Sequence, residues 1–210
     1  MVSLAKVPRH AARMAHQLLN PLLFDTISIN EYPKSGGTWV CRMIRDVTGF
    51  RFDDNAIPRP GRSVVKYHRL PLAVKRQAVV VRDPRDVFVS FYFHCKAIFQ
   101  DDPFNGQIVA MVEAEVFSRH ADEPSRIAAF VDRLIDKPIY PRFTWHAFYD
   151  HYLAQGVPVF RYEDFRSDPA ATLDRLLKAM DVAVPASVID KVAEDHAIDK
   201  ILAARGGEGG

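Results

Sequence analysis

The sequence predicts a single α/β domain with a mainly parallel central sheet flanked by helices. Short apolar runs rich in Val and Ile alternate along the chain with segments of helical periodicity. Solid apolar strands of this kind are typical of a parallel sheet that is buried on both faces. Polar residues follow directly after several of these runs, and ligands of such sheets bind beyond the carboxyl ends of the strands. The length of 210 residues suits one domain with a full core.

The predicted elements follow one another in a regular order along the chain. Strands are expected at Thr26–Asn30, Ser63–Tyr67, Gln77–Val81 and Val157–Arg161. Helices are expected at Thr38–Val47, after Asp83-Pro84, at Phe143–Ala154, at Asp168–Met180 and after Val184-Pro185. Asp168 and Pro169 suit the N-cap and the first turn of a helix. Tyr162-Glu163-Asp164 is expected to open a loop.

Composition excludes several classes of protein. A hydrophobic content of 48% and a net charge of +2 are ordinary for a globular protein, and this charge is too small to indicate nucleic-acid binding. No apolar run reaches the length of a membrane-spanning helix. Cys41 and Cys95 lack metal-ligand spacing and are expected to be reduced, which suits a cytoplasmic protein.

The chain is expected to divide into three parts: a basic amphipathic helix over residues 1–22, the main domain over 23–205 and a glycine-rich tail over 206–210. The N-terminal segment has apolar residues at helical spacing with Lys, Arg and His on its other faces. Two interpretations are open for it, packing on the domain and peripheral contact with a membrane surface.

The segment Tyr32–Trp39 connects the first strand to the first helix through the adjacent glycines Gly36 and Gly37. A helix N-terminus reached in this way presents backbone N–H groups and a partial positive charge to one point. Lys34, Ser35 and Thr38 add a cation and two hydroxyl donors, so the loop is expected to bind a phosphate. The alternative is a turn that needs a positive φ. Lys34 precedes the glycines, whereas the lysine of the nucleoside triphosphate loop follows them.

Other polar residues stand at the ends of the remaining predicted strands. Lys66 and His68 lie at the end of the second strand, Arg82 after the third and Tyr162 after the fourth. Arg82 can bind a second phosphate bidentately, with Ser90 on the following helix. Two separate phosphate sites indicate a nucleoside with phosphates at both ends, and His68 can accept the proton of an incoming hydroxyl.

Four segments resemble the motifs of sulfotransferases that use 3′-phosphoadenylyl sulfate (PAPS), in the order of that family. Pro33-Lys34-Ser35-Gly36-Gly37-Thr38-Trp39 is similar to the 5′-phosphosulfate loop, and Arg82-Asp83-Pro84-Arg85-Asp86-Val87-Phe88-Val89-Ser90 to the 3′-phosphate motif. Lys66-Tyr67-His68 resembles the catalytic Lys-x-His segment, and Tyr162-Glu163-Asp164 a later segment. The resemblance extends from Pro33 to about Asp181.

The resemblance implies a role for each of these residues. His68 would be the general base, with Lys34 and Lys66 stabilising charge on the transferred group and on the leaving 5′-phosphate. Backbone N–H groups of Gly36 to Trp39 would hold the 5′-phosphate, and Trp39 would stack on adenine with Tyr162 nearby. Arg82 and Ser90 would bind the 3′-phosphate. PAPS is thus the expected co-substrate and 3′,5′-ADP (PAP) the product, with no metal, because the loop and the lysines supply the positive charge.

The chain departs from the family pattern at several positions. Gly37 replaces a common threonine, and Asp83 replaces a frequent asparagine. Arg205-Gly206-Gly207-Glu208-Gly209-Gly210 resembles only the first half of a segment that folds over the nucleotide in many relatives. Arg205 and the backbone of Gly207 are expected to reach the 3′-phosphate; a flexible tail is the alternative.

The expected function is transfer of a sulfuryl group from PAPS to a hydroxyl or amine of a small molecule, sugar or lipid. Residues 96–156, rich in aromatics, are expected to build much of a partly apolar acceptor pocket. Two alternatives stay open: a small-molecule kinase that uses ATP, and a protein that binds PAPS or PAP without turnover.

Overall fold

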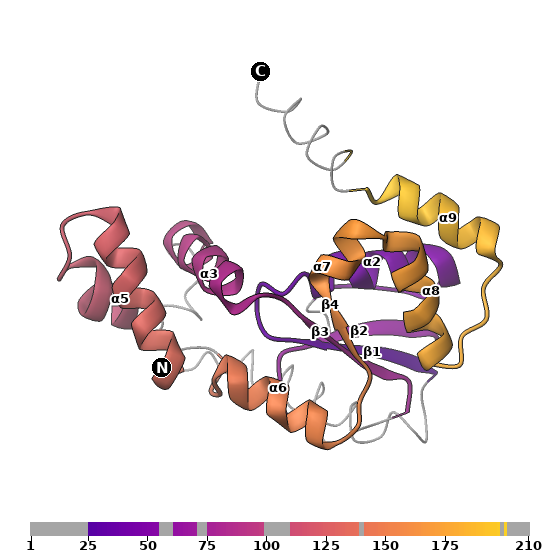
Figure 1. Cartoon of the computed structure of the whole chain (residues 1–210), viewed down its shortest axis with the longest axis horizontal. Helices are drawn as coiled ribbons and strands as arrows, with labels where there is room; N and C mark the ends of the chain where they lie inside the picture. Colours follow the sequence, from indigo (N-terminus) through magenta and orange to yellow (C-terminus); the bar gives the residue numbers. More distant parts are fainter. Residues whose placement is uncertain are drawn as a thin grey trace.

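Four parallel strands form the centre of the fold, in the order β2-β1-β3-β4 (Figure 1). They are β1 (Thr26–Glu31), β2 (Ser63–Tyr67), β3 (Gln77–Val81) and β4 (Val159–Arg161). The computed structural model describes residues 25–54, 61–70, 75–98, 110–138, 141–197 and 200. The predicted N-terminal helix, residues 99–109 of the predicted acceptor region, and Arg205 and Gly207 lie outside the described residues.

The register of the sheet brings the strand ends to one edge. Asn30 pairs with Tyr67 of β2, and Glu31 pairs with Val80 of β3. Val81 pairs with Arg161 at the end of β4. Because all four strands are parallel, the segments that begin at Tyr32, His68, Arg82 and Tyr162 leave the sheet on the same side.

One face of the sheet is covered by α2 (Gly37–Thr48), α8 (Pro169–Ala179) and α9 (Ala186–Asp195), with α7 (Tyr162–Ser167) at its edge (Figure 1). Alternate strand residues such as Ile27 and Ile29 point into this layer, as the period of a strand requires. The helices contribute buried residues that include Val40, Met43, Ile44, Leu173, Leu177 and Ile189.

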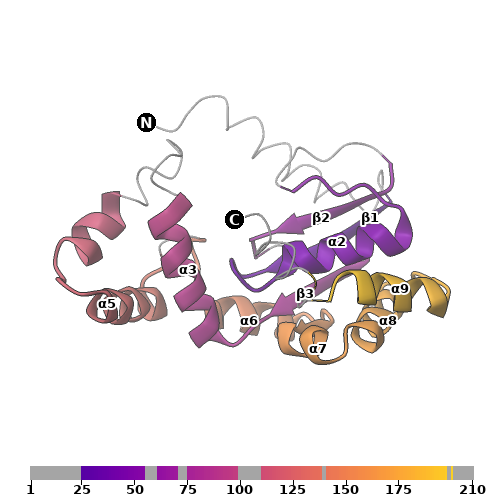
Figure 2. The same cartoon turned by 90° about the horizontal axis from the view of Figure 1, so that it is seen from above.

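A second core lies on the other face, where α3 (Pro84–Ile98), η1 (Glu113–Phe117), α5 (Glu123–Asp136) and α6 (Trp145–Ala154) pack. Val79 and Val81 of β3 face this layer. The core is strongly aromatic, with Phe91, Phe130, Phe148 and Tyr152 fully buried. Figure 2 shows α3 and α5 together on one side of the sheet, far from α8 and α9.

Most helix boundaries have a local chemical cause. Asp168 accepts a hydrogen bond from the Ala171 N–H and is followed by Pro169, so α8 begins as predicted. Thr144 caps α6 in the same way, and the helix starts at Trp145, later than the predicted Phe143. The predicted loop at Tyr162 is wrong, because these residues form the first turn of α7. Its first turn carries Glu163 and Asp164, which suit a helix N-terminus.

Both cysteines are buried and unpaired, as predicted. Burial raises the pKa of Cys95 to about 12, which keeps this thiol protonated at neutral pH. Among the described residues, no helix combines the length and the apolar character that crossing a membrane requires.

Candidate functional site at the carboxyl edge of the sheet

The segment between β1 and α2 forms a tight loop at the sheet edge. Lys34 has a φ of 75° and Gly36 a φ of 94°, both in the left-handed region. A Cβ on Gly36 would stand 2.5 Å from Cδ2 of Tyr162, so this position needs glycine both for its φ and for the approach of the tyrosine ring. The helix that follows starts with its N-terminus directed at the loop.

The loop holds several hydrogen-bond donors around this N-terminus. The Ser35 hydroxyl is fully buried and has no hydrogen-bond partner among the described residues. The Trp39 N–H donates to the Gly36 carbonyl, and the Gly37 N–H donates to Oε2 of Glu31 at 2.5 Å. The buried unpaired hydroxyl fits an anion-binding loop, because buried polar groups normally find a partner.

Two lysines place positive charge at the same spot. Lys66, only 7% exposed, donates from Nζ to the Thr38 hydroxyl at 2.5 Å. Burial opposes its charge, but Glu31 and Asp54 outweigh this effect and raise the pKa of Lys66. Burial lowers the pKa of Lys34. The Glu31 carboxylate acts to raise this pKa, whereas the charges of Lys66 and Arg82 lower it further. A bound anion would relieve this cost of holding Lys34 charged.

His68 follows β2 directly and is half-buried beside the loop. Its Nδ1 lies 3.0 Å from the Glu31 carbonyl oxygen. A carbonyl can only accept a hydrogen bond, so Nδ1 carries the proton and Nε2 carries the lone pair in the neutral ring. Burial lowers the pKa of His68, with Glu31 opposing and Lys66 adding to the shift. The imidazole is therefore neutral at pH 7, the form that accepts a proton.

Arg82 and Tyr162 form a second cluster beside the loop. The Arg82 guanidinium lies 4.6 Å above the centre of the Tyr162 ring, the same ring that packs against Gly36. Nε of Arg82 is buried without a hydrogen-bond partner among the described residues, while Nη2 pairs with Asp86. Trp39 meets the Tyr162 ring edge-on at 5.7 Å. Tyr162 thus joins the loop to Arg82.

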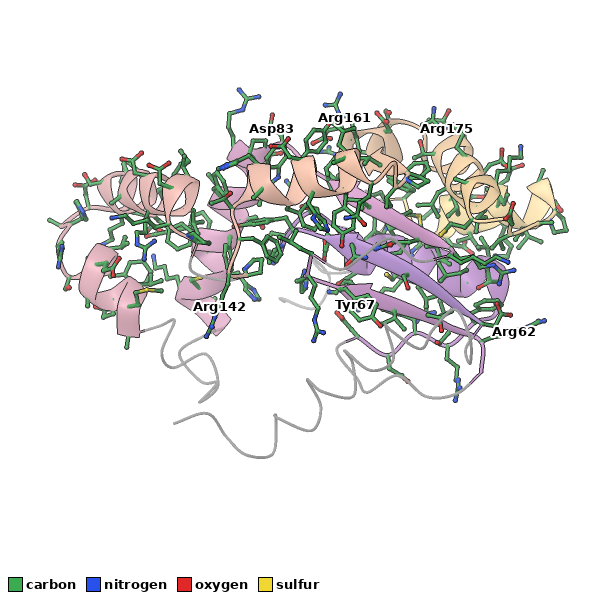
Figure 3. All side chains as sticks on the ribbon, turned by 90° about the horizontal axis from the view of Figure 1, so that it is seen from below. Arg62, Tyr67, Asp83, Arg142, Arg161 and Arg175 are labelled. Carbon is green, nitrogen blue, oxygen red and sulfur yellow. The ribbon has the colours of Figure 1, made fainter. Side chains whose placement is uncertain are left out.

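The other residues of the predicted nucleotide site have fewer direct contacts with Arg82 and with the loop. Ser90 is half-buried on α3, and the described contacts include none between Ser90 and Arg82. The Trp39 indole N–H donates to the His196 carbonyl at 3.1 Å, which links the loop end of α2 to the end of α9. Asp83 does not pair with Arg82; it binds Arg85. Figure 3 shows Asp83 near Arg161 on the upper edge.

The structure adds contacts of residues to which the sequence assigned no catalytic or phosphate-binding role. Glu31 contacts the loop, Lys66 and His68, and Asp54 lies 3.1 Å from Lys66 Nζ. Glu163 accepts a hydrogen bond from the Asp83 N–H at 3.0 Å and so ties α7 to the start of α3. The pKa of His94 on α3 is lowered by burial and by the charges of Lys34 and Lys66.

The arrangement suits a phosphate or sulfate ester. Loop donors, two lysines and Arg82 provide a cation-rich, partly buried edge, with a neutral histidine beside it. Among the described residues, no group of three or more His, Cys, Asp or Glu side chains is placed to hold a metal ion.

A family model described as the sulfotransferase domain matches residues 50–201. This match confirms the resemblance to the sulfotransferase family and includes the segments around Lys66, Arg82 and Tyr162. The loop Tyr32–Trp39 lies before the matched residues, so its assignment depends on its own sequence and geometry. A comparison with curated protein sequences found no match.

Solved structures with the same fold include the mouse sulfotransferase SULT7A1 complexed with PAP. That structure is 17% identical with a TM-score of 0.59, and the match covers 84% of this chain and 65% of the SULT7A1 chain. Retinol dehydratase with androsterone and inactive cofactor PAP is 15% identical with a TM-score of 0.59, covering 90% of this chain and 70% of its own. Retinol dehydratase with retinol and PAP is 16% identical with a TM-score of 0.58, and the match covers 92% of this chain and 70% of the retinol dehydratase chain. This chain therefore spans 65% of the first of these structures, and the likeness confirms the predicted fold.

Proposed function

Because this chain belongs to the sulfotransferase domain family, we propose that it transfers a sulfuryl group from PAPS to an acceptor hydroxyl or amine. The observation that carries the proposal is the convergence of the Lys34 loop, Lys66 and His68 at one sheet edge. PAPS supplies an activated sulfuryl group, and 3′,5′-ADP is the product that leaves.

His68 is the general base of the proposed reaction. Its Nδ1 is held by the Glu31 carbonyl, so Nε2 is the nitrogen that takes the acceptor proton. The lowered pKa supports this role, because a base must be neutral before it can accept a proton.

Lys34 and Lys66 stabilise negative charge on the transferred group and on the leaving 5′-phosphate. Lys66 is held by the Thr38 hydroxyl before any ligand arrives, so little reorganisation of this group is needed. The buried Ser35 hydroxyl and the backbone of Gly36, Gly37 and Thr38 would hold the 5′-phosphate.

Arg82 would bind the 3′-phosphate, because its buried Nε has no hydrogen-bond partner in the part of the chain that the structure describes and a phosphate offers two oxygens. Ser90 would contribute a hydroxyl from α3, and Arg205 and Gly207 would approach from the C-terminal segment. Trp39 and Tyr162 would provide the aromatic surface for adenine.

The acceptor is proposed to be a partly apolar small molecule. The aromatic core around α3 and α6 borders the site through Tyr32, which begins the loop and packs against Phe88, Phe143 and Phe148. Two of the similar structures are complexes with androsterone and retinol, which are apolar compounds.

Replacing His68 by Ala tests the proposal. We expect transfer of labelled sulfate from PAPS to fall by about 10²-fold or more, because general base catalysis typically contributes this much. Affinity for 3′,5′-ADP should change by no more than about threefold, since His68 holds no phosphate in the proposal. Lys178→Ala is the control, because Lys178 is an exposed residue on α8 whose ammonium group pairs with Asp174.

The acceptor panel should contain phenols, sugars, sterols and lipids. Equal loss in both variants, or full activity of His68→Ala, would remove His68 from the mechanism. Wild type that binds 3′,5′-ADP tightly and transfers to no acceptor would favour a nucleotide-binding protein without turnover.

A further inference from the structure

Glu31 places a buried carboxylate inside the loop that is proposed to bind an anion. The residue ends β1 and is 3% exposed. Its Oε2 accepts the hydrogen bond of the Gly37 N–H at 2.5 Å, and its Oε1 lies 3.6 Å from Nζ of Lys66. The roles given above to the loop, the lysines and His68 do not account for this carboxylate.

The contact explains why position 37 is glycine. Gly37 is not among the residues with positive φ, so its backbone does not require glycine. A Cβ there would stand 2.7 Å from Cδ and 2.9 Å from Oε2 of Glu31. Glu31 therefore fills the space that a side chain at position 37 would need, including the threonine that is common at this position in the sulfotransferase loop.

The position of the carboxylate is that of a bound anion. It accepts the first N–H of α2, at the positive end of the helix, and it faces an ammonium group. A second anion at the same point would meet a like charge in a partly buried setting, where repulsion is weakly screened. An incoming 5′-phosphate and the Glu31 carboxylate thus compete for the same donors.

We propose that Glu31 is an internal counter-anion of the loop and sets the affinity for the nucleotide. The carboxylate occupies the Gly37 N–H and neutralises Lys66 in the free protein, and the 5′-phosphate takes its place on binding. This inference rests on the proposed function, since it concerns the same nucleotide site. Its consequence is weaker binding of 3′,5′-ADP than the donors alone would give.

Glu31→Gln removes the charge and keeps the shape of the side chain. We expect this variant to bind 3′,5′-ADP about tenfold more tightly in titration calorimetry, the scale of one charge-assisted contact. Asp54→Asn is the matched control. Asp54 lies 3.1 Å from Lys66 and accepts a hydrogen bond from the Thr38 hydroxyl, but 35% of its side chain is exposed, and its contacts do not include the Gly37 N–H. Its effect should be no more than about twofold, because exposed charges are screened.

Three results would overturn the inference: unchanged affinity in Glu31→Gln, weaker binding in Glu31→Gln, or an equal gain in Asp54→Asn. The first two would mean that the carboxylate does not oppose the phosphate. The third would mean that any negative charge near Lys66 has the same effect.

A second measurement needs no nucleotide and separates this inference from the proposed function. In urea unfolding, Gly37→Ala should destabilise the wild-type protein, because the new methyl group meets Glu31. The same change in a Glu31→Ala background should cost much less, so the two substitutions should be strongly non-additive. Additive effects would overturn the inference. A wild type that binds no 3′,5′-ADP would contradict the proposed function, while this unfolding cycle would still decide whether Glu31 occupies the space beside Gly37.

Discussion

A single backbone carbonyl determines which nitrogen of His68 can act as a base. The Glu31 carbonyl oxygen accepts from Nδ1, so the ring is held with Nε2 carrying the lone pair. The same residue places its carboxylate against Gly37 and near Lys66. Glu31 therefore connects His68, a lysine and the loop through two different groups, and the relative positions of all three depend on the end of β1.

The burial of His68 predicts the pH dependence of activity. Its pKa lies below the ordinary value of 6.5, chiefly because burial disfavours the charged ring. The base is active when neutral, so kcat/KM should rise with pH through the lowered pKa and be close to its plateau by pH 7. A pH profile of sulfate transfer at low PAPS concentration measures this.

An acidic limb centred well above 6.5 would contradict that assignment, since it would require a His68 that gains a proton more easily than in water. The profile of His68→Ala provides the control. The residual activity of this variant should not show the rise with pH that deprotonation of His68 produces in the wild type.

The sequence predicted the residues whose identity alone indicates their chemistry. Lys34, His68 and Arg82 could be assigned to one edge of the sheet because each is a polar residue that follows an apolar run, and Lys66 because it lies near the end of one. Glu31 could not be recognised in this way. It was one residue beyond the predicted strand, and only the folded loop brings its carboxylate to the Gly37 N–H.

At the scale of elements, the strands were easier to predict than the helix ends. The continuous apolar runs at Ser63–Tyr67 and Gln77–Val81 are strands with the predicted bounds, because both faces of the sheet are buried. The start of α7 was missed because Tyr162 follows β4 without any intervening turn residue. The π-helical turn at Glu113–Phe117, which contacts α5, also has no signal in the hydrophobic period.

The N-cap of α8 gives a prediction about stability. Asp168 is exposed, and its carboxylate accepts from the Ala171 N–H at 3.1 Å. Asp168→Ala leaves that N–H without its acceptor and should lower the free energy of unfolding by about 1 kcal/mol. Urea unfolding measures the change, and the m-value should stay the same because the fold is unaltered.

Asp190→Ala on α9 is the matched control for this prediction. It is also an exposed aspartate on a neighbouring helix, but it lies inside α9 and not at its N-cap. Its effect should stay within about 0.5 kcal/mol, the usual range of a surface change. If both variants lost the same stability, the cap would not be the cause.

At the scale of the whole molecule, the site lies where the two cores of the domain meet. The helices α2, α8 and α9 pack on one face of the sheet, and α3, α5 and α6 pack on the other. Tyr162, between the Gly36 loop and Arg82, belongs to the segment that leaves β4. A nucleotide held by the loop and by Arg82 would therefore contact both layers, so its binding should stabilise the domain as a unit.

Ligand-dependent thermal stability tests this expectation and separates PAPS chemistry from ATP chemistry. A ligand at a hundred times its Kd stabilises the folded state by about 2.7 kcal/mol. For a domain of this size that corresponds to a rise in Tm of about 5–10 °C. We expect 3′,5′-ADP to produce this rise in differential scanning fluorimetry, whereas ATP at the same concentration should shift Tm by less than about 2 °C, because it lacks the 3′-phosphate that Arg82 would bind.

Arg82→Ala links this shift to the proposed 3′-phosphate contact. The Arg82 guanidinium has a buried Nε without a partner among the described residues, and it lies against the Tyr162 ring. Its loss should reduce the stabilisation by 3′,5′-ADP by about 1.5–3 kcal/mol, the range of a hydrogen bond to a charged group, and leave the small ATP shift unchanged. An ATP shift that equals the 3′,5′-ADP shift in wild type, and that survives in Arg82→Ala, would favour an ATP-dependent kinase. The site would then distinguish nucleotides by some feature other than the 3′-phosphate.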